Sequence, residues 1–267
     1  MTPVLMYHGL HADQAGPGHF HPIYSVRPDT FVEQIEWLVR AGYRSTRLGD
    51  IGTTRNPVVI SFDDGDVSNV DVALPLLADR GLVAEFFVVS DYIGRSGMVG
   101  PDDGRALVEA GMGVQSHGRT HRPLEDLSTT DLEGELVESR AAIESWSGAP
   151  VDALSLPGGR GRERERTAAR RLGYRYVLNS VPGTNQRWVP GEYLQRIAVT
   201  RDMTLRDFSS LVEWTGLRPR RAWARYQAFE GAKRALGNSS YLRLRALLMA
   251  ARGKLLSAEP PDGRRPS

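Results

Sequence analysis

The chain has 267 residues, of which 40% are hydrophobic, and a formal net charge of +2. This is enough for one enzyme-sized domain with a substantial core, and no stretch approaches the roughly 18 apolar residues of a membrane span. Cysteine is absent, which excludes disulfides, thiolate metal ligands and cysteine nucleophiles. The first residues, TPVLMYH, lack the basic leader and apolar length of a signal peptide, so we expect a cytoplasmic protein.

Apolar, β-rich runs alternate with helical patterns along the first 217 residues. Strands are predicted at 4–8, 43–46, 58–62, 83–89, 113–117, 153–157, 174–178 and 196–200. Helices are predicted at 29–41, 69–80, 102–110, 129–147, 162–172 and 204–215, each followed by a glycine that can end it. Seven or eight strands alternating with helices predict an α/β fold, a distorted (β/α)7–8 barrel.

The predicted strand at 58–62 is followed at once by two acids and a glycine, Asp63, Asp64 and Gly65. Its sequence, VVISF, indicates a strand buried on both faces of a parallel sheet. The carboxyl ends of such strands form the ligand-binding face, so the two acids fit a functional site. They fit equally an Asp-Gly turn in which one acid caps the next helix, and the doublet alone leaves both interpretations open.

A second polar cluster follows the predicted strand at 113–117. His117 and His121 are four residues apart, so both imidazoles could reach one ion. Two imidazoles and one carboxylate suit a divalent cation, most naturally zinc, with positions left for water and substrate. The acids and the histidines together therefore predict a catalytic metal site, in which one acid binds the metal and its neighbour accepts a proton.

Three segments resemble, in order and spacing, the first three motifs of the polysaccharide deacetylases, also called the NodB-homology or carbohydrate esterase family 4 group: ISFDDG at 60–65, SHGRTH at 116–121 and LSLPGG at 154–159. The resemblance extends over residues 3–216. It implies a metal-dependent hydrolase that removes an N-linked acetyl group from an amino sugar and needs no organic cofactor. Carried onto this chain, it makes Asp63 the general base and makes Asp64, His117 and His121 the metal ligands.

The third motif departs from the family pattern. Ser155 stands where many members have an Arg that orients the base, so that charge is either absent or supplied by Arg119 or Arg160. Gly158 takes the oxyanion position, where a backbone N–H survives any change of side chain except to proline. Substrate contacts are predicted for three further residues, the last of them as a surface on which a sugar ring could stack: Pro157, Arg160 and Trp188.

The general acid is the largest departure, because no histidine follows position 121 and many members take this acid from their last strand. His8 ends the first predicted strand, which a barrel brings beside its last strand. MYHGL at 6–10 also resembles the exopolysaccharide and biofilm deacetylase branch, which implies an acid role for His8. A structural role for His8 is the alternative. Three other histidines fall in a loop and are expected to face solvent or substrate: His11, His19 and His21.

The basic residues are concentrated near the carboxyl terminus. Residues 218–267 hold twelve Arg and Lys against three acids, which gives this segment +9 and leaves −7 for the rest. We predict a deacetylase barrel over 1–217, a basic helical extension over 218–256 and a disordered tail over 257–267. Leucines with helical spacing at 241–256 fit either packing on the barrel or contact with an anionic membrane, which would place the protein at the inner membrane face.

These features predict a hydrolase that removes an N-acyl group, most often acetyl, from an amino-sugar or glycoside substrate. The substrate could be lipid-linked if the basic segment meets a membrane, and no nucleic-acid partner is expected. Other amides would suit the same centre, among them a formamide, a cyclic amide or a biosynthetic intermediate. An inactive carbohydrate-binding relic is an alternative of a different class; the missing Arg favours it, and the intact base and ligands oppose it.

Overall fold

The computed structural model describes residues 1–13, 20, 22–186, 191–228 and 231. The chain divides into two compact units, residues 1–220 and 221–267. The first contains the sheet, and a helix that begins at residue 218 continues to 228 in the second. Most of the predicted extension and all of the predicted disordered tail lie outside the described residues. Among the helices that are described, none has both the length and the apolar character needed to cross a membrane.

All eight predicted strands are present, as β1, β4 to β9 and β12. Four strands of two residues each were not predicted: β2, β3, β10 and β11. The strands span Thr2–Tyr7 (β1), Gly9–Leu10 (β2), Ser25–Val26 (β3), Arg44–Ser45 (β4), Pro57–Phe62 (β5), Glu85–Val88 (β6), Gly113–Ser116 (β7), Ala153–Ser155 (β8), Tyr176–Leu178 (β9), Thr184–Asn185 (β10), Tyr193–Leu194 (β11) and Ile197–Ala198 (β12).

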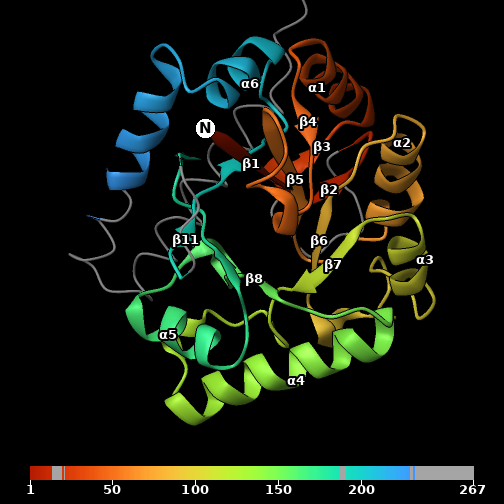
Figure 1. Cartoon of the computed structure of the whole chain (residues 1–267), viewed down its shortest axis with the longest axis vertical. Coiled ribbons are helices and arrows are strands. Elements are labelled where there is room, and N and C mark those ends of the chain that lie inside the picture. The colour runs from red at the N-terminus through yellow and green to blue at the C-terminus, as the bar shows by residue number, and fades with distance from the viewer. Residues whose placement is uncertain (14–19, 21, 187–190, 229–230, 232–267) are drawn as a thin grey trace, which may run out of the picture. The chain divides into compact units, whose positions relative to one another are not determined.

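The strands form a nearly closed barrel, as predicted. Parallel pairing runs from β1 through β5, β6, β7, β8 and β9 to β11, and β12 pairs with β1. Only Gln195 and Arg196 separate β11 from β12, so this short segment joins the two ends of the sheet. The first and last strands are therefore neighbours. Helices surround the strands on the outside (Figure 1).

The helices also match the prediction. They span Pro28–Arg40 (α1), Leu74–Ala78 (α2), Asp103–Glu109 (α3), Thr129–Ser147 (α4), Glu163–Arg171 (α5) and Leu205–Val212 (α6). The helix expected at 69–80 is split into a π-turn at Asn69–Ala73 and α2, and the change falls beside Pro75, which has no N–H to donate. Short 3₁₀ turns lie at Pro22–Tyr24, Leu48–Asp50, Ser90–Tyr92, Leu124–Asp126 and Pro157–Gly159.

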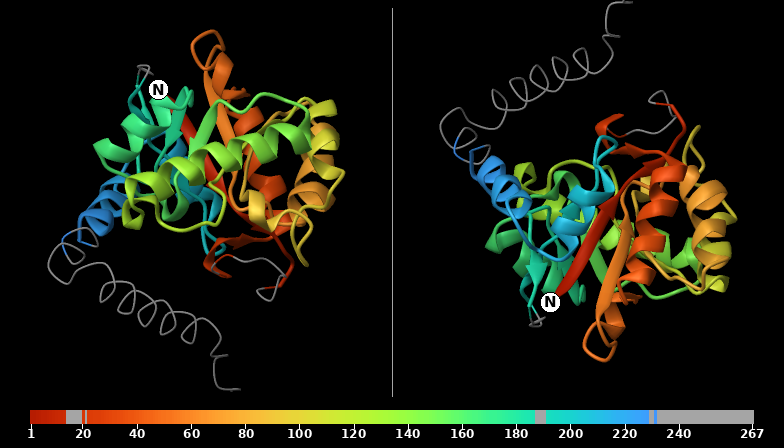
Figure 2. Two further views of the ribbon diagram at one scale, coloured as in Figure 1. Left: turned by 90° about the horizontal axis from the view of Figure 1, so that it is seen from below. Right: turned by 90° about the horizontal axis from the view of Figure 1, so that it is seen from above.

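Helix α4 is the longest helix among the described residues, and it lies across one side of the barrel, with β1 and α1 on another (Figure 2). It begins at a good cap, because the Ser128 side chain accepts a hydrogen bond from the Asp131 N–H. It ends at Gly148, whose φ of +73° is the left-handed conformation that glycine adopts without strain. These two signals fix its ends where the sequence predicts them.

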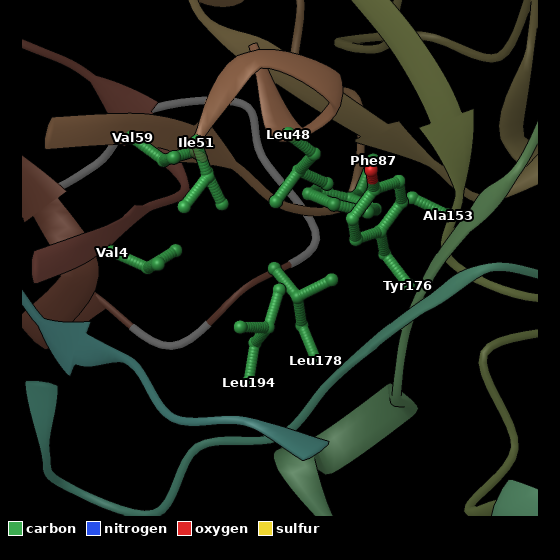
Figure 3. Close-up of a cluster of buried hydrophobic side chains, with 9 residues drawn as sticks. All are labelled: Val4, Leu48, Ile51, Val59, Phe87, Ala153, Tyr176, Leu178 and Leu194. Carbon is green, nitrogen blue, oxygen red and sulfur yellow. The ribbon is translucent and has the colours of Figure 1, made fainter. Parts of the chain in front are cut away.

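The barrel interior is apolar toward the amino ends of the strands. Alternate residues of neighbouring parallel strands face inward together, as Val4 and Val59 do across β1 and β5. Leu48 and Ile51 join this cluster from the segment before β5 (Figure 3). The whole cluster is Val4, Leu48, Ile51, Val59, Phe87, Ala153, Tyr176, Leu178 and Leu194.

The same alternation makes the other end of the barrel polar. Met6 pairs with Ser61, two residues beyond Val4 and Val59 along the two strands. The next inward positions are His8 and Asp63, and the Asp63 N–H continues the ladder by donating to the Tyr7 carbonyl at 3.0 Å. Because every second residue of a strand faces inward, these two side chains lie at the carboxyl-terminal mouth of the barrel.

Candidate metal and catalytic site

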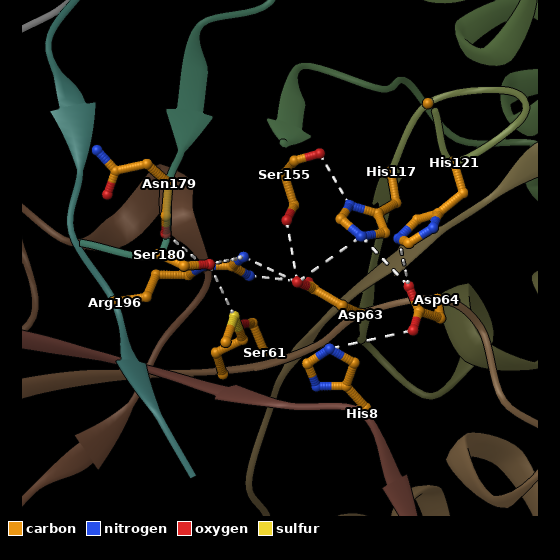
Figure 4. Close-up of polar contacts among 12 residues, drawn as sticks. His8, Ser61, Asp63, Asp64, His117, His121, Ser155, Asn179, Ser180 and Arg196 are labelled. Carbon is orange, nitrogen blue, oxygen red and sulfur yellow. Dashed lines mark hydrogen bonds and ion pairs between the residues drawn. The ribbon is translucent and has the colours of Figure 1, made fainter. Parts of the chain in front are cut away.

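Three of the predicted residues converge on one point at the carboxyl-terminal mouth. The Nε2 atoms of His117 and His121 lie 3.3 and 3.2 Å from Asp64 Oδ1. Each residue offers a ligand atom, and these atoms all lie within 4.8 Å of one another. The three side chains point toward one another (Figure 4). Asp64 and His117 are buried and His121 is partly exposed, so the cluster meets solvent on the side of His121.

The donor set fits a cation. His117 Nδ1 lies 2.8 Å from the Ser155 carbonyl oxygen, which can only accept a hydrogen bond, so the proton of the neutral ring is on Nδ1. Its Nε2 then presents a lone pair toward Asp64 Oδ1, a buried oxygen without a hydrogen-bond partner in the described part of the chain. Two acceptors that face each other repel unless a positive ion lies between them, and a second bond that fixes the ring is typical of metal-bound histidine.

The electrostatics of the pocket also favour a cation. Burial lowers the pKa of His117, but Asp63 and Asp64 outweigh this effect and raise the pKa above its usual value. Burial raises the pKa of Asp64, yet the close imidazoles of His117 and His121 hold that pKa well below the usual range. The two carboxylates thus attract positive charge to the point between the imidazoles.

Two of the three residues have unusual backbone conformations. Asp64 has a φ of +75° and His121 a φ of +62°. Residues other than glycine seldom adopt this left-handed conformation, which is strained and is found often at functional sites. In the described part of the chain only two other such residues have positive φ, Asn56 and Trp214. The fold therefore holds both turns that carry these side chains against a local preference.

Asp63 lies beside the cluster but is bonded differently. Arg196 donates to it from both ends of the guanidinium, Nη1 to Oδ1 and Nη2 to Oδ2, each at 2.8 Å. The Ser155 hydroxyl donates to Oδ2 at 3.1 Å. Burial raises the pKa of Asp63, but Arg196 and the neighbouring imidazoles outweigh it and keep the pKa below its usual value. Asp63 is therefore held as a carboxylate in one orientation.

Arg196 was not among the residues predicted from the sequence. Its side chain is fully buried, and its Nε donates to the Asn179 carbonyl at 2.9 Å. It lies between β11 and β12, where the barrel closes. The expectation that Arg119 or Arg160 would supply the missing charge is corrected, because Arg196 occupies both oxygens of Asp63, while Arg119 pairs with Glu138 on α4. Arg160 follows the Pro157–Gly159 turn.

His8 enters the site from β1, on the side opposite the other two imidazoles (Figure 4). Its Nε2 is 4.0 Å from Asp64 Oδ2. The ring stacks on Tyr24 with centroids 4.6 Å apart, and the His8 carbonyl accepts a hydrogen bond from Asn69 at 2.7 Å. Burial lowers the pKa of His8 below its usual value, despite the raising effects of Asp64 and Asp63. His8 is thus a fixed imidazole that faces the cluster.

The remaining predicted residues have mixed outcomes. Pro157 is buried and Gly158 is exposed, with a φ of +67°, next to the strand end that bonds His117. Trp188, His19 and His21 lie outside the described residues. His11 does not face solvent freely, which corrects one of its two expected placements: its ring lies between the Ser25 hydroxyl at 3.1 Å and Asp66 Oδ1 at 3.2 Å. Its contact with substrate stays a prediction.

The site has the chemistry of a hydrolase that activates water. One cluster of two imidazoles and a carboxylate suits a divalent cation, a separate ionised carboxylate lies beside it, and an imidazole faces both. All of these groups stand at the carboxyl-terminal mouth of a parallel barrel, where such enzymes have their active sites.

Comparisons with known proteins identify the family. The sequence model of the polysaccharide deacetylases matches residues 50–177. YxkH of Bacillus subtilis (strain 168), provisionally named a polysaccharide deacetylase, is 24% identical over 219 residues, which are 79% of this chain and 76% of that protein. The structure of BC0361, a polysaccharide deacetylase from Bacillus cereus, is 26% identical with a TM-score of 0.71, and the match covers 79% of this chain and 68% of that one.

A more distant structure shares the fold. IcaB from Ammonifex degensii is 22% identical with a TM-score of 0.67, and the match covers 80% of this chain and 96% of that one. The chain therefore contains a polysaccharide deacetylase domain, which the family model matches over residues 50–177. His8 and Arg196 lie outside the segment that the family model matches, one on each side of it.

Proposed function

We propose that the protein removes N-acetyl groups from amino-sugar residues of a carbohydrate, with a divalent metal, most naturally zinc, held by Asp64, His117 and His121. The polysaccharide deacetylase domain supports the reaction class, the hydrolytic deacetylation of carbohydrate. The observation that carries the finer proposal is the pairing of two adjacent acids with different partners. Asp64 faces two imidazoles, whereas Asp63 is held by Arg196.

A divalent ion bound at the three ligands would polarise the acyl carbonyl and lower the pKa of a water molecule toward neutrality. Asp63 then accepts the proton of the attacking water. Arg196 and Ser155 fix its carboxylate, and Oδ1, which bonds Arg196, keeps a second lone pair for that proton. The lowered pKa of Asp63 keeps this base ionised at neutral pH.

The departing amine needs a proton, and we propose that His8 passes to it the proton that Asp63 takes from the attacking water, so that no further proton source is needed. His8 faces the cluster from the side opposite His117 and His121, and Tyr24 holds its ring by stacking. Fixed placement favours a general acid, because the donor is already correctly positioned for proton transfer. We further propose that the exposed Gly158 N–H binds the developing oxyanion and that Arg160 and Trp188 contact the sugar.

Two alternatives predict different results in an activity assay. A deacylase for a formamide, a cyclic amide or a biosynthetic intermediate would use the same groups, and the family favours carbohydrate over these. An inactive carbohydrate-binding relic would have no use for an ionised base that is held at both oxygens. The described residues retain the base, the metal-ligand set and an orienting Arg, which supports an active enzyme.

The test is acetate release from a panel of N-acetylated sugars. The panel should contain monosaccharides, oligomers, polymers, nucleotide sugars and lipid-linked sugars, with a formamide and a cyclic amide as comparison substrates. We expect acetate from at least one N-acetyl sugar, loss of turnover after chelation, and recovery with added zinc. Turnover of only the comparison amides, or activity that chelation leaves unchanged, would contradict the proposal.

We also propose a cytoplasmic location with peripheral contact at the inner membrane face through the basic segment at 218–256. Its excess of Arg and Lys would attract anionic lipid, and its leucines would add apolar burial. The full chain should float with anionic vesicles at low salt and remain behind with neutral vesicles. Equal behaviour with both kinds of vesicle would contradict the membrane proposal and leave the catalytic one intact.

A further inference from the structure

The turn between His117 and His121 carries two of the three metal ligands on an improbable backbone. Gly118 has a φ of +79° and His121 one of +62°. Glycine adopts this conformation freely, but His121 does not, so something outside the turn must hold it. The contacts of the turn identify what does so.

The carbonyl side of the turn is bonded to the segment after β6. Ser90 N–H donates to the Gly118 carbonyl at 3.2 Å, and Asp91 N–H donates to the Arg119 carbonyl at 3.0 Å. The Gly118 N–H turns back to the Ser116 hydroxyl at 3.1 Å. These bonds fix one side of the turn and leave the N–H groups of Arg119 and Thr120 to be satisfied.

Glu135 on α4 bonds both of those groups with a single oxygen. Its Oε1 accepts from the Arg119 N–H at 2.9 Å and from the Thr120 N–H at 2.6 Å. The Thr120 hydroxyl lies 3.0 Å from Oε1 and 3.1 Å from Oε2. Glu135 is only 6% exposed, so its charge is stabilised chiefly by these bonds.

The carboxylate comes from a rigid support. Glu135 lies in the second turn of α4, behind the capped amino end of that helix. Hydrogen bonds to a charged acceptor are stronger than those between neutral groups, and burial strengthens them further. Since the two N–H groups immediately precede His121, their direction sets the direction in which its imidazole leaves the chain.

We propose that Glu135 is a positioning residue for the metal centre: it holds the 118–120 turn so that His121 can meet Asp64 and His117 on one ion. The inference rests on the proposed metal-dependent function. Glu135 binds neither metal nor substrate itself. Its removal should therefore weaken metal binding while all three ligands remain in the chain.

The test is the zinc affinity of the full chain, measured by competition with a chromophoric chelator. Glu135→Ala should weaken zinc binding roughly 10- to 100-fold, as is usual when the group behind a metal ligand is removed. Glu135→Gln should weaken it less, because an amide oxygen can still accept from both N–H groups. Glu133→Ala is the matched control on the same helix, since Glu133 pairs with Arg171 instead, and it should bind zinc like the wild type.

A second pair of variants tests the turn without touching Glu135. A Cβ on Gly118 would lie 3.2 Å from Glu135 Oε1 and 3.3 Å from Pro157 Cγ, whereas one on Gly111 would meet nothing within 4 Å. Both glycines have a φ of +79°, so the two alanine variants share the backbone strain. Gly118→Ala should weaken zinc binding and Gly111→Ala should not, which keeps the inference testable if Glu135→Ala fails to fold.

Wild-type zinc affinity in Glu135→Ala would overturn the inference. If Glu135→Ala does not fold, wild-type zinc affinity in both Glu135→Gln and Gly118→Ala would overturn it. A wild-type chain that binds no zinc or other divalent ion would instead overturn the proposed function. The two failures are therefore distinguishable in one titration series.

Discussion

The two ends of the barrel each bury a carboxylate beside an arginine, with opposite results. At the carboxyl-terminal mouth, the fully buried Arg196 bonds both oxygens of Asp63, and the pKa of Asp63 is lowered. At the amino-terminal end, Arg47 and the Leu48 N–H both bond Oε1 of Glu85. Oε2 of Glu85 has no hydrogen-bond partner among the described residues, and burial raises the pKa of Glu85 despite Arg47.

The difference shows why two buried carboxyl groups have pKa values shifted in opposite directions. Both residues are almost fully buried, so burial alone does not decide the charge. A buried carboxylate stays ionised only when its hydrogen bonds and a close positive charge outweigh the loss of water. At the mouth Arg196 and the imidazoles outweigh burial for Asp63, whereas at the amino-terminal end burial outweighs Arg47 and the Leu48 N–H and raises the pKa of Glu85. We therefore expect function at one end and only a contribution to stability at the other.

The largest effect should follow the loss of a metal ligand. His117→Ala should reduce bound zinc to trace levels and abolish turnover, because only two of the three donors remain and the lost donor is the ring that Ser155 fixes. Glu85→Gln, at the other end, should leave zinc content unchanged. Metal analysis of the purified proteins measures both, and a full zinc complement in His117→Ala would contradict the site.

Replacing Arg196 or Arg47 singly with methionine compares the two ends of the barrel directly. Arg196→Met should destabilise the protein by about 3–5 kcal/mol, the usual cost of unpairing a buried charge, and lower kcat roughly 10²-fold as the base loses its orientation. Arg47 is about one-third exposed, so Arg47→Met should cost about 1 kcal/mol or less and leave kcat unchanged.

Denaturant unfolding and initial rates measure these two quantities. Arg196→Lys serves as a further control, because lysine keeps the charge but cannot bond both oxygens of Asp63 in one plane. It should recover more stability than kcat. Equal loss of kcat in the Arg196 and Arg47 variants would remove the distinction between the two ends.

Removing His8 tests the proton donor. His8→Ala should lower kcat by roughly 10²- to 10⁴-fold if protonation of the amine is assisted there, while zinc affinity stays near that of the wild type. Steady-state kinetics with an N-acetyl sugar, and a chelator competition, give both values. An unchanged kcat would show that His8 has a structural role only.

The smallest effect should be the pH dependence caused by Glu85. A carboxyl whose pKa is raised on folding favours the folded state below its ordinary pKa, and this advantage is lost as pH rises through the raised value. Glu85→Gln does not titrate, so its stability relative to the wild type should improve between about pH 4 and pH 7. Urea unfolding of both proteins at the two pH values measures the change; a constant difference would contradict it.

The sequence predicted most of the fold because its signals are local. Strands such as VVISF and helix ends such as Gly148 are read from a few neighbouring residues, and all eight strands appear where expected. The cluster that could hold a metal was also predictable, since His117 and His121 are four residues apart and Asp64 follows a strand. Parallel strands bring such ends together without any further information.

Arg196 could not be found in this way. It lies 133 residues from Asp63 along the chain, and a single Arg before a two-residue strand carries no local signal. Only the closure of the barrel between β11 and β12 brings it to Asp63. Glu135 was missed for a related reason, because on a helix surface an acid that bonds backbone N–H groups is indistinguishable from a solvated one.

The central claim is that two adjacent acids do different work, Asp63 as base and Asp64 as metal ligand. The most direct test is the zinc content of Asp63→Asn and Asp64→Asn, measured beside acetate release. We expect Asp63→Asn to retain zinc at the wild-type level and to lose most turnover, because an amide cannot accept the proton of water. Asp64→Asn should lose both. Loss of zinc in Asp63→Asn with retention in Asp64→Asn would contradict the account.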